Sequence, residues 1–405
     1  MFFDRFREAV ARLPAGLIRP GPAAPTGAVD AAERALGARL PAIFAAFLRS
    51  FDGVDLFHES IVVAGVGPGA TLRLDDLEDG DASPDGLLVF AEALGGDRFA
   101  FDGAGGVVRL RGGSDERWRA GGDFERWLDG TIAHQRLLYG PDGEFSPDAF
   151  EPDGAEVVPV IALRQTERAL RLCDESAEWQ HERGVALRRL GRLPDAKDAF
   201  ERAAALDPQN PWPRFDAGRV ALELGPGHAR EARLAFAEAA DLERGEPGAR
   251  LWVWAARAAL LAGDPEQVAA CRAQALTRDP GIAAALDRAR QAAEDEDEPE
   301  ALAEAEALLA AVQGPIPTGR ARLTVLSSAE TPPARAARSA QPPAEKVASP
   351  TAMTTANRRP ARTAQPAAGA SQAPAPARRT PPPAPRRPRP AGPRPPGGPR
   401  SGSRR

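Results

Sequence analysis

Four histidines, two cysteines and several glycine-rich or acidic segments are the residues of this 405-residue chain that could carry out chemistry. Cys173 and Cys271 stand 98 residues apart, with neither a CxxC motif nor a neighbouring histidine. We interpret both as buried structural residues. Metal binding would need histidines at a spacing such as HxxxH, which places two ligands on one helix face. No pair has it among His58, His134, His181 and His228.

Glycine clusters at 65–69, 103–106 and 112–113 could bind phosphate. None fits GxxxxGK[ST], or a GxGxxG motif leading into a helix, so we interpret them as turns of a small sheet. Acidic residues gather between Asp75 and Asp85 without aromatic or basic residues that would shift a carboxyl pKa. We interpret this segment as a solvated loop, with mimicry of nucleic acid toward a basic partner as the alternative. The sequence therefore predicts no catalytic residue, no metal site and no cofactor.

A recurring spacing indicates the elements that would position side chains in the middle of the chain. Two glycine–proline pairs are each 17 residues apart, and each pair brackets helix-forming sequence. A repeat of helix pairs is typical of a binding scaffold rather than an enzyme. Its signature residues are Gly184, Gly191, Ala196, Phe200 and Pro208 in the first copy, Gly218 and Phe236 in the second, and Gly263 and Pro280 in the third.

This pattern resembles the tetratricopeptide repeat, because Gly184 and Gly218 are 34 residues apart, the length of that family's unit. We predict repeats at about 177–208, 211–246 and 249–280 within a helical array over 155–315. A capping helix is expected over roughly 282–313. Small residues at 184, 218 and 256 would let paired helices approach, while Phe200 and Phe236 fill the space between repeats. Asp264 is interpreted as the N-cap of a helix that begins at Pro265.

The first 150 residues predict an α+β domain, because helical spacing gives way to short alternating runs separated by Gly, Asp and Pro. An amphipathic helix is expected from Phe2 to just before Pro14, and others at 29–36, 42–51 and 124–138. The runs that predict an antiparallel sheet are 61–64, 72–74, 87–93, 98–101 and 107–110.

The order of motifs between residues 25 and 140 resembles the SUKH superfamily, which holds fungal cell-wall-synthesis regulators and bacterial toxin-immunity proteins. The resemblance implies a protein-binding domain without chemistry of its own. It also implies, for members of the immunity type, binding and blocking of toxins such as nucleases and deaminases. The matching residues include Glu33, Leu36, Gly37, Leu40, Pro41, Phe47, Gly53, Gly96 and Asp97.

Charge divides the chain into an acidic body and a basic tail. Residues 331–405 hold 15 Lys and Arg and one acidic residue, Glu345, so residues 1–330 carry a formal charge of −19 in a chain of −5. From about Ser327 onward Pro, Ala, Arg, Ser and Gly dominate, which predicts a disordered tail over 327–405. We expect it to be a spacer or to contact polyanions nonspecifically.

Neither a secretory signal nor a membrane span is predicted, because the first residues mix charges among apolar ones and no run of 18 apolar residues occurs. We expect a cytoplasmic protein, and the abundance of Ala, Arg, Gly and Pro with few Lys favours a bacterial source with a GC-rich genome.

The first helix of each repeat normally lines a concave surface, and helical periodicity gives the candidate peptide groove as His181, Arg188, Phe215, Arg219, Trp254 and Arg257. The alternative is that Phe215 and Trp254 are core residues and the arginines only solubilise the surface. We predict a non-enzymatic adaptor or scaffold that combines SUKH-like recognition with a repeat array binding protein or peptide ligands. Two alternatives stay open: an immunity protein that neutralises a toxin, and an unrecognised enzyme within the sheet domain.

Overall fold

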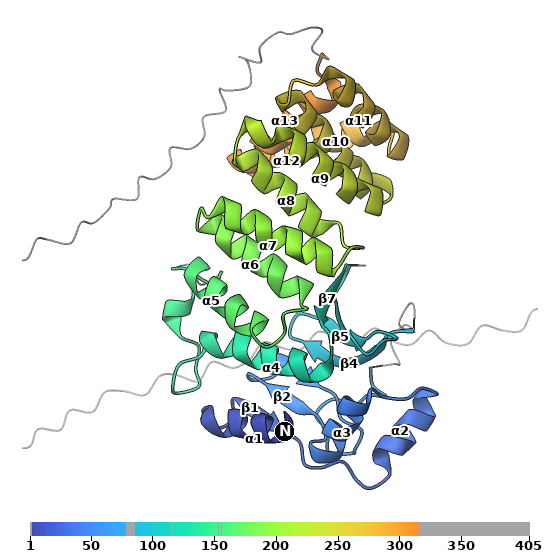
Figure 1. The fold of residues 1–405 in the computed structure, drawn as a ribbon, viewed down its shortest axis with the longest axis vertical. Helices are drawn as coiled ribbons and strands as arrows, with labels where there is room; N and C mark the ends of the chain where they lie inside the picture. Colours follow the sequence, from blue (N-terminus) through green and yellow to red (C-terminus); the bar gives the residue numbers. More distant parts are fainter. Residues whose placement is uncertain (1, 78–85, 115, 153, 155, 316–405) are drawn as a thin grey trace, which may run out of the picture. The chain divides into compact units, whose positions relative to one another are not determined.

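A seven-stranded antiparallel sheet dominates the N-terminal part of the chain, and its strands are ordered β1 to β7 as they occur in sequence (Figure 1). This computed structural model describes residues 2–77, 86–114, 116–152, 154 and 156–315. Each strand pairs with the next in antiparallel register, so β1 and β7 form the two edges. The strands are β1 Ile18–Pro20, β2 Val54–Leu56, β3 Ile61–Val63, β4 Leu88–Ala93, β5 Arg98–Phe101, β6 Val107–Leu110 and β7 Arg117–Gly121.

Aromatic side chains from helices and strands form the core of the sheet domain. The rings of Phe90 and Phe101 stack at 4.1 Å, and Phe44 and Trp127 lie within 5.5 Å of Phe90. All four side chains are at most 2 % exposed, which is the burial expected for the centre of one hydrophobic core. The helices of this domain are α1 Phe2–Arg12, α2 Ala28–Leu36, α3 Ala42–Ser50 and α4 Phe124–Gln135.

The predicted α+β class is confirmed, and the strands differ from the expected runs in two ways. Residues 72–74 form no strand and contribute only an isolated bridge between Gly65 and Arg73. Three strands were not predicted: β1, β2 and β7. Alternation cannot be read over the three residues of β1 and β2, and all three residues of β2 are buried. β7 does alternate polar and apolar residues, from Arg117 to Ala120, but this run is short and was not recognised.

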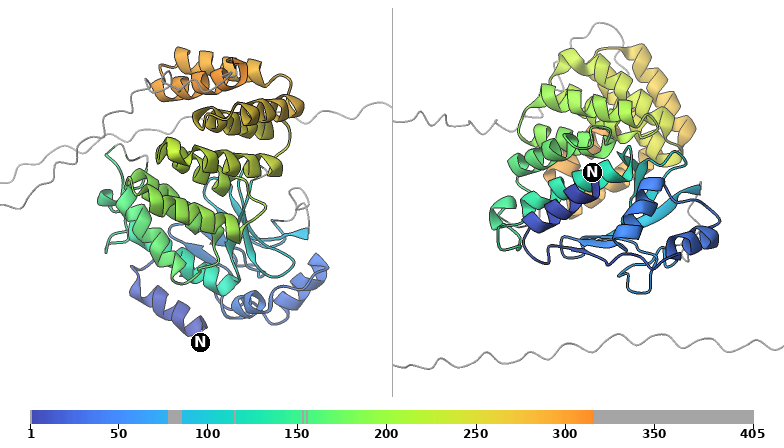
Figure 2. Two further views of the ribbon diagram at one scale, coloured as in Figure 1. Left: turned by 45° about the horizontal axis from the view of Figure 1, so that its top comes forward. Right: turned by 60° about the horizontal axis from the view of Figure 1, so that its bottom comes forward.

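Nine helices follow the sheet within the described residues and pack in chain order from α5 to α11, as Figures 1 and 2 show from three directions. The predicted helical array is confirmed, and α5 is an additional helix that precedes the first repeat. The helices are α5 Pro159–Leu170, α6 Ala177–Arg189, α7 Leu193–Leu206, α8 Trp212–Glu223, α9 Ala229–Leu242, α10 Gly245–Leu261, α11 Pro265–Arg278, α12 Ile282–Asp295 and α13 Pro299–Gln313.

The segment expected to hold one capping helix contains two helices, α12 and α13. Asp297 adopts a left-handed conformation with φ of 55°, which breaks the helical path two residues before Pro299 begins α13. Proline suits a first turn because its missing N–H has no helical partner there. Leu308 and Ala311 of α13 are buried in the cluster around α10.

Glycines at the helix crossings are in contact with aromatic rings. A Cβ atom added to Gly184 would lie 2.6 Å from the ring of Phe200, and one added to Gly218 would lie 2.7 Å from Phe236. Both rings are fully buried, so α6 approaches α7 and α8 approaches α9 only because these positions lack a side chain. Asp264 accepts a hydrogen bond from the Gln267 N–H at the start of α11, as expected for an N-cap.

Two properties of the described part of the chain bear on function. No helix there is both long and apolar enough to cross a membrane. No group of three His, Cys, Asp or Glu residues is arranged there to hold a metal ion. The predicted basic tail, and residues 78–85 of the acidic loop, lie outside the described residues.

Candidate interaction groove

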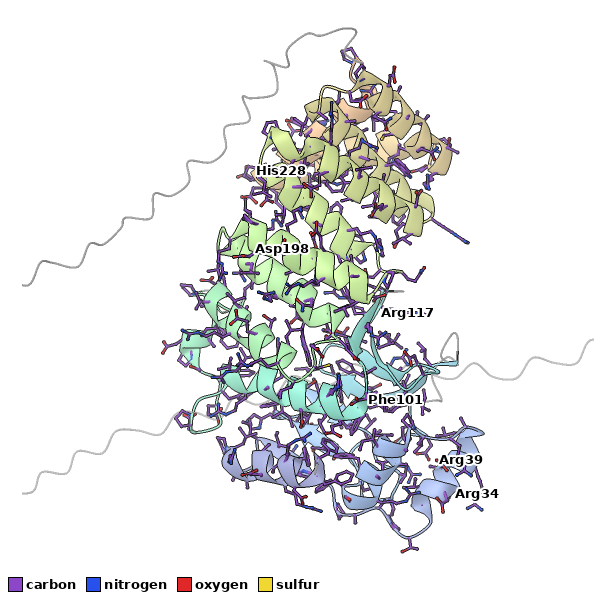
Figure 3. All side chains as sticks on the ribbon, in the orientation of Figure 1. Arg34, Arg39, Phe101, Arg117, Asp198 and His228 are labelled. Carbon is purple, nitrogen blue, oxygen red and sulfur yellow. The ribbon has the colours of Figure 1, made fainter. Side chains whose placement is uncertain are left out.

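The last strand of the sheet meets the helical repeats directly. Figure 3 labels Arg117 in β7, whose carbonyl oxygen accepts a hydrogen bond from the Asn210 side chain at 2.8 Å. The backbone N–H of Arg119 donates to the Asp207 carboxylate at 3.1 Å. Asp207 and Asn210 belong to the α7–α8 loop, so the first repeat satisfies backbone groups that an edge strand would otherwise leave unpaired.

A partly buried ionic bridge joins the sheet to the first repeat. The Arg109 guanidinium in β6 donates to Asp97 at 2.8 Å and to Glu178 of α6. The Gly112 N–H donates to the other oxygen of Asp97 at 2.8 Å. These bonds and the Arg109 charge lower the pKa of Asp97, although burial acts in the opposite direction. Burial raises the pKa of Glu178, because only 9 % of its side chain is exposed, while the Arg109 charge lowers it by less.

Packing between α4 and α6 brings the same two regions together. A Cβ atom at Gly130 of α4 would lie 2.4 Å from the Trp179 ring, so the tryptophan occupies the space left by a missing side chain. The His134 ring stacks on the Trp179 ring, with a centroid distance of 6.0 Å and an interplanar angle of 15°. The His134 Nε2 atom lies 3.1 Å from Glu182. The orientation of the sheet relative to the first repeat is therefore set by both packing and charge.

Between these contacts lies a groove of about 830 Å³, which we call the shared groove because the sheet domain and the repeats both line it. Trp118 of β7 and His134 of α4 come from the sheet domain, and Val185, Trp212 and Phe215 come from α6 and α8. The ring of Trp118 lies 4.6 Å from that of His181. Aromatic side chains around a concave surface are a composition typical of protein interaction sites.

The carboxylates in the shared groove have partners. Glu116 pairs with Arg111, Glu178 with Arg109, Glu182 with His134, and Asp216 with His181. The Arg219 guanidinium differs, because it forms no ion pair with any described residue and lies over the rings of Phe215 and Trp254 at 5.7 and 5.9 Å. A charge without a counter-ion is the feature of this groove that a ligand could match.

The structure brings together three of the six residues predicted to form the peptide groove. His181, Phe215 and Arg219 line the shared groove. Arg188 lies outside its lining and pairs with Glu223 of α8 at 2.5 Å. Trp254 is 5 % exposed and packs with Phe236 at a centroid distance of 5.4 Å. Arg257 lies over the Trp254 ring at 5.0 Å.

Sequence reasoning missed the wall contributed by the sheet domain. Trp118 and His134 line the groove from this domain, far in sequence from the predicted set, and Trp212 of α8, close to the predicted Phe215, was missed as well. The only local signal was a tryptophan between two arginines in residues 117–119, on a strand that was not predicted.

The SUKH-like motif residues mainly shape the sheet domain. The Glu33 carboxylate accepts the Leu40 N–H at 3.1 Å and pairs with Arg39, which is labelled beside Arg34 in Figure 3. Gly37, Gly53 and Gly96 have φ values of 64°, 84° and 91°, which favour glycine. The others pack or begin helices: Leu36 is half-buried, Leu40 and Phe47 are buried, and Pro41 precedes α3. Asp97 alone acts at the junction, through Arg109.

The repeat signature residues lie at crossings and helix ends. Ala196, Phe200 and Phe236 are fully buried. Gly191 and Gly263 follow the ends of α6 and α10, with φ values of 72° and 67°. Pro208 and Pro280 lie just beyond the ends of α7 and α11.

Comparisons with known proteins agree with this division of the chain. Residues 24–130 match the model of the SMI1 / KNR4 family (SUKH-1), and residues 177–210 match the tetratricopeptide repeat. No curated protein matches the chain. Among solved structures, it is similar to YrrB, described as a TPR protein with an unusual peptide-binding site, at 21 % identity over 38 % of this chain and 78 % of that one (TM-score 0.27).

Two further structures have similar repeats. MamA from Desulfovibrio magneticus RS-1 has 19 % identity over 38 % of this chain and 85 % of its own, with a TM-score of 0.27. A thermophilic TPR protein from Thermus thermophilus has 18 % identity over 37 % of this chain and 90 % of its own, with a TM-score of 0.28. At these scores the structural matches carry no argument about function.

Proposed function

We propose that this protein is a non-enzymatic adaptor that holds a partner protein in the shared groove. The two family matches support a role in protein interaction. The observation that carries the proposal is that one groove has aromatic walls from both regions, with Trp118 on one side and Trp212 and Phe215 on the other. A partner bound there would contact the sheet domain and the repeats together.

The fixed junction supports this role. Arg109 joins Asp97 to Glu178, and Trp179 packs onto Gly130, so the two walls keep their spacing without a ligand. A groove formed before binding requires little ordering when the partner arrives, which preserves affinity. We take residues 1–150 and 155–315 as the two functional domains, with 327–405 as a tethering tail, and we infer a cytoplasmic location.

A bulky residue in the groove tests the proposal. Val185 is 39 % exposed and lines the groove, so Val185→Trp should obstruct it without disturbing the core. Leu276 on α11 is 43 % exposed and lies outside the groove lining, so Leu276→Trp is the matched control. Full-length chains are used as affinity baits in extract from the source organism. The proposal requires proteins retained by wild type and Leu276→Trp but at least tenfold depleted with Val185→Trp; equal retention by all three contradicts it.

A second experiment distinguishes the immunity alternative from the adaptor function. If the protein neutralises a toxin through its SUKH-like domain, residues 1–150 alone should protect cells that express the cognate toxin. An adaptor that uses the shared groove requires residues 155–315 as well, because Val185, Trp212 and Phe215 belong to them. Protection by the shorter chain would replace the adaptor proposal with the immunity role.

A further inference from the structure

At one equivalent position, the first two repeats have a carboxylate and the third has an aromatic ring. Two residues before the small residue of each helix crossing stand Glu182, Asp216 and Trp254. At the contact between α6 and α8, Asp216 lies 2.7 Å from His181, and Glu223 pairs with Arg188. At the contact between α8 and α10, Trp254 occupies the position that Asp216 occupies one repeat earlier. An indole therefore stands where a carboxylate would neutralise a neighbouring cation.

Two guanidinium groups lie over this indole without an ion-pair partner in the part of the chain that the structure describes. The Cζ atoms of Arg219 and Arg257 lie 5.9 and 5.0 Å from the centre of the Trp254 ring. Neither arginine forms an ion pair with a described residue, whereas Arg188 on the same series of helices does. The two arginines are themselves equivalent, since each directly follows the small residue of its helix crossing.

Burial makes the missing counter-ion costly. Arg219 and Arg257 are both half-buried. Desolvation lowers the pKa of Arg257, the charge of Glu304 on α13 opposes this, and the Arg219 charge lowers the pKa by less than Glu304 raises it. Glu304 is exposed and does not come close enough to form an ion pair. Two like charges that are partly removed from water would be stabilised by an anion placed between them.

We propose that Arg219 and Arg257 bind a carboxylate of the partner protein. The inference rests on the proposed adaptor function, because Arg219 also lines the shared groove. A polyanion such as a nucleic acid is disfavoured, since residues 1–330 carry a formal charge of −19 and the groove also holds Glu116, Glu182 and Asp216. A single carboxylate carries less charge and therefore meets less of that repulsion. Phe215 and Trp212 beside Arg219 suit an apolar side chain next to the acidic group.

The test uses small probes and side-chain NMR signals of the full-length chain. Protein with ¹⁵N-labelled arginine is titrated with an acetylated, amidated Ala-Asp-Leu tripeptide. The neutral Ala-Asn-Leu tripeptide is the control for charge. An acetylated Ala-Ala-Leu tripeptide with a free C-terminus distinguishes a terminal carboxylate from a side-chain one, and inorganic phosphate tests a different anion. The Nε–H signals of Arg219 and Arg257 are followed.

Arg278 provides a matched control within the chain. Its Cζ atom lies 5.2 Å from the centre of the Trp252 ring, so it repeats the stacking geometry, but it already pairs with Asp241 at 2.9 Å. We expect saturable shifts of Arg219 and Arg257 with at least one carboxylate peptide, at least tenfold weaker binding of Ala-Asn-Leu, and no shift of Arg278. Arg219→Gln together with Arg257→Gln should weaken the binding at least tenfold, while Arg278→Gln leaves it unchanged.

The outcomes separate this inference from the adaptor function. Binding of the neutral Ala-Asn-Leu peptide as tight as that of the better carboxylate peptide, or binding of phosphate alone, overturns the carboxylate site. Binding that survives Arg219→Gln with Arg257→Gln in a folded protein, judged by an unchanged melting temperature, overturns it as well. If Val185→Trp still abolishes partner capture, the adaptor function stands without this site.

Discussion

The helices around α6 and those around α10 are held together by different means. α6 forms ionic contacts on both sides: Glu178 pairs with Arg109 of the sheet, and His181 and Arg188 pair with residues of α8. Around α10 the contacts are aromatic, with Phe215, Phe236 and Trp254 within 5.6 Å of one another. Two charges near α10, on Arg219 and Arg257, lack ion-pair partners among the described residues, whereas Arg278 beside Trp252 pairs with Asp241.

This difference separates contacts that fix orientation from contacts that supply stability. Partly buried ion pairs add little net free energy, because removing the charges from water costs nearly as much as their attraction returns. They penalise any arrangement that leaves a charge unpaired, so they specify how α6 sits against the sheet. Buried rings contribute through the area they remove from water. The proposed carboxylate site uses the two arginines beside Trp254 that have no ion-pair partner among the described residues.

The largest effect is expected from the aromatic contacts. Phe236→Ala should lower the free energy of unfolding by about 3–5 kcal/mol, because it leaves a cavity beside Phe215 and Trp254. Phe200→Ala removes an equally buried ring whose nearest aromatic neighbour is His181, at 5.1 Å, so we expect it to cost less. Urea unfolding followed by circular dichroism measures both. A larger loss for Phe200→Ala would reverse our assignment of stability to the α10 side.

The helix crossings at Gly184 and Gly218 should lose similar stability when a methyl group is added. Gly184→Ala and Gly218→Ala would each place a Cβ atom within 2.7 Å of a phenylalanine ring, so each should cost about 1–3 kcal/mol by overpacking. At an ordinary helix position the same change would stabilise the helix. Thermal and urea unfolding of both variants provide the measurement. If only one variant is destabilised, the two crossings are not equivalent, and the backbone at one of them must move to admit the added methyl group.

The stability that the ionic contacts between the sheet and α6 contribute should decrease in acid. Gly112 and Arg109 hold the pKa of Asp97 below its ordinary value of 3.8, so the folded state stabilises the carboxylate. That stability is fully present above pH 3.8 and is lost as pH falls through the lower pKa of the folded state. Asp97→Asn should therefore cost about 1–2 kcal/mol at neutral pH, and its difference from wild type should shrink below pH 3.8.

The comparison between wild type and Asp97→Asn requires unfolding curves from neutral pH down to the acid limit of folding. Phe236→Ala is the control, because its deficit does not involve a titrating group. A deficit for Asp97→Asn that stays constant across this range would contradict the role assigned to the carboxylate.

The smallest effect is expected for the pair between Arg188 and Glu223. Their side chains are 31 % and 37 % exposed, so solvent screens the attraction. A double-mutant cycle with Arg188→Ala and Glu223→Ala should give a coupling energy below about 1 kcal/mol, decreasing further in about 1 M salt. A coupling energy above about 2 kcal/mol would give the ionic contacts a share of stability comparable to the aromatic ones.

Sequence patterns were sufficient wherever neighbouring residues determine the structure. The period of 34 residues, the N-cap at Asp264 and the small residues at the helix crossings were predicted, and the structure adds that the rings of Phe200 and Phe236 lie against Gly184 and Gly218. The strands at residues 98–101 and 107–110 have the expected bounds. Each of these features follows from the spacing of residue types along one element or between two adjacent elements, and a single sequence records that spacing.

The edges and the groove could not be predicted in this way. β7 is a short alternating run that was not predicted, and the backbone groups of Arg117 and Arg119 bond to Asn210 and Asp207, 93 and 88 residues later. Trp118 thereby reaches His181, and Arg109 reaches Glu178. Such partners are chosen by the packing of one region on another, and no periodicity within either region encodes the pairing.

The sequence by itself determined a sheet domain followed by helical repeats, because turn residues, apolar period and small residues at crossings act locally. Only the tertiary structure decided which basic side chains have partners. His181 and Arg188 find carboxylates on α8, whereas Arg219 and Arg257 meet the indole of Trp254. The physical reason is that an ion pair depends on the distance between atoms on different helices, and folding sets that distance through packing.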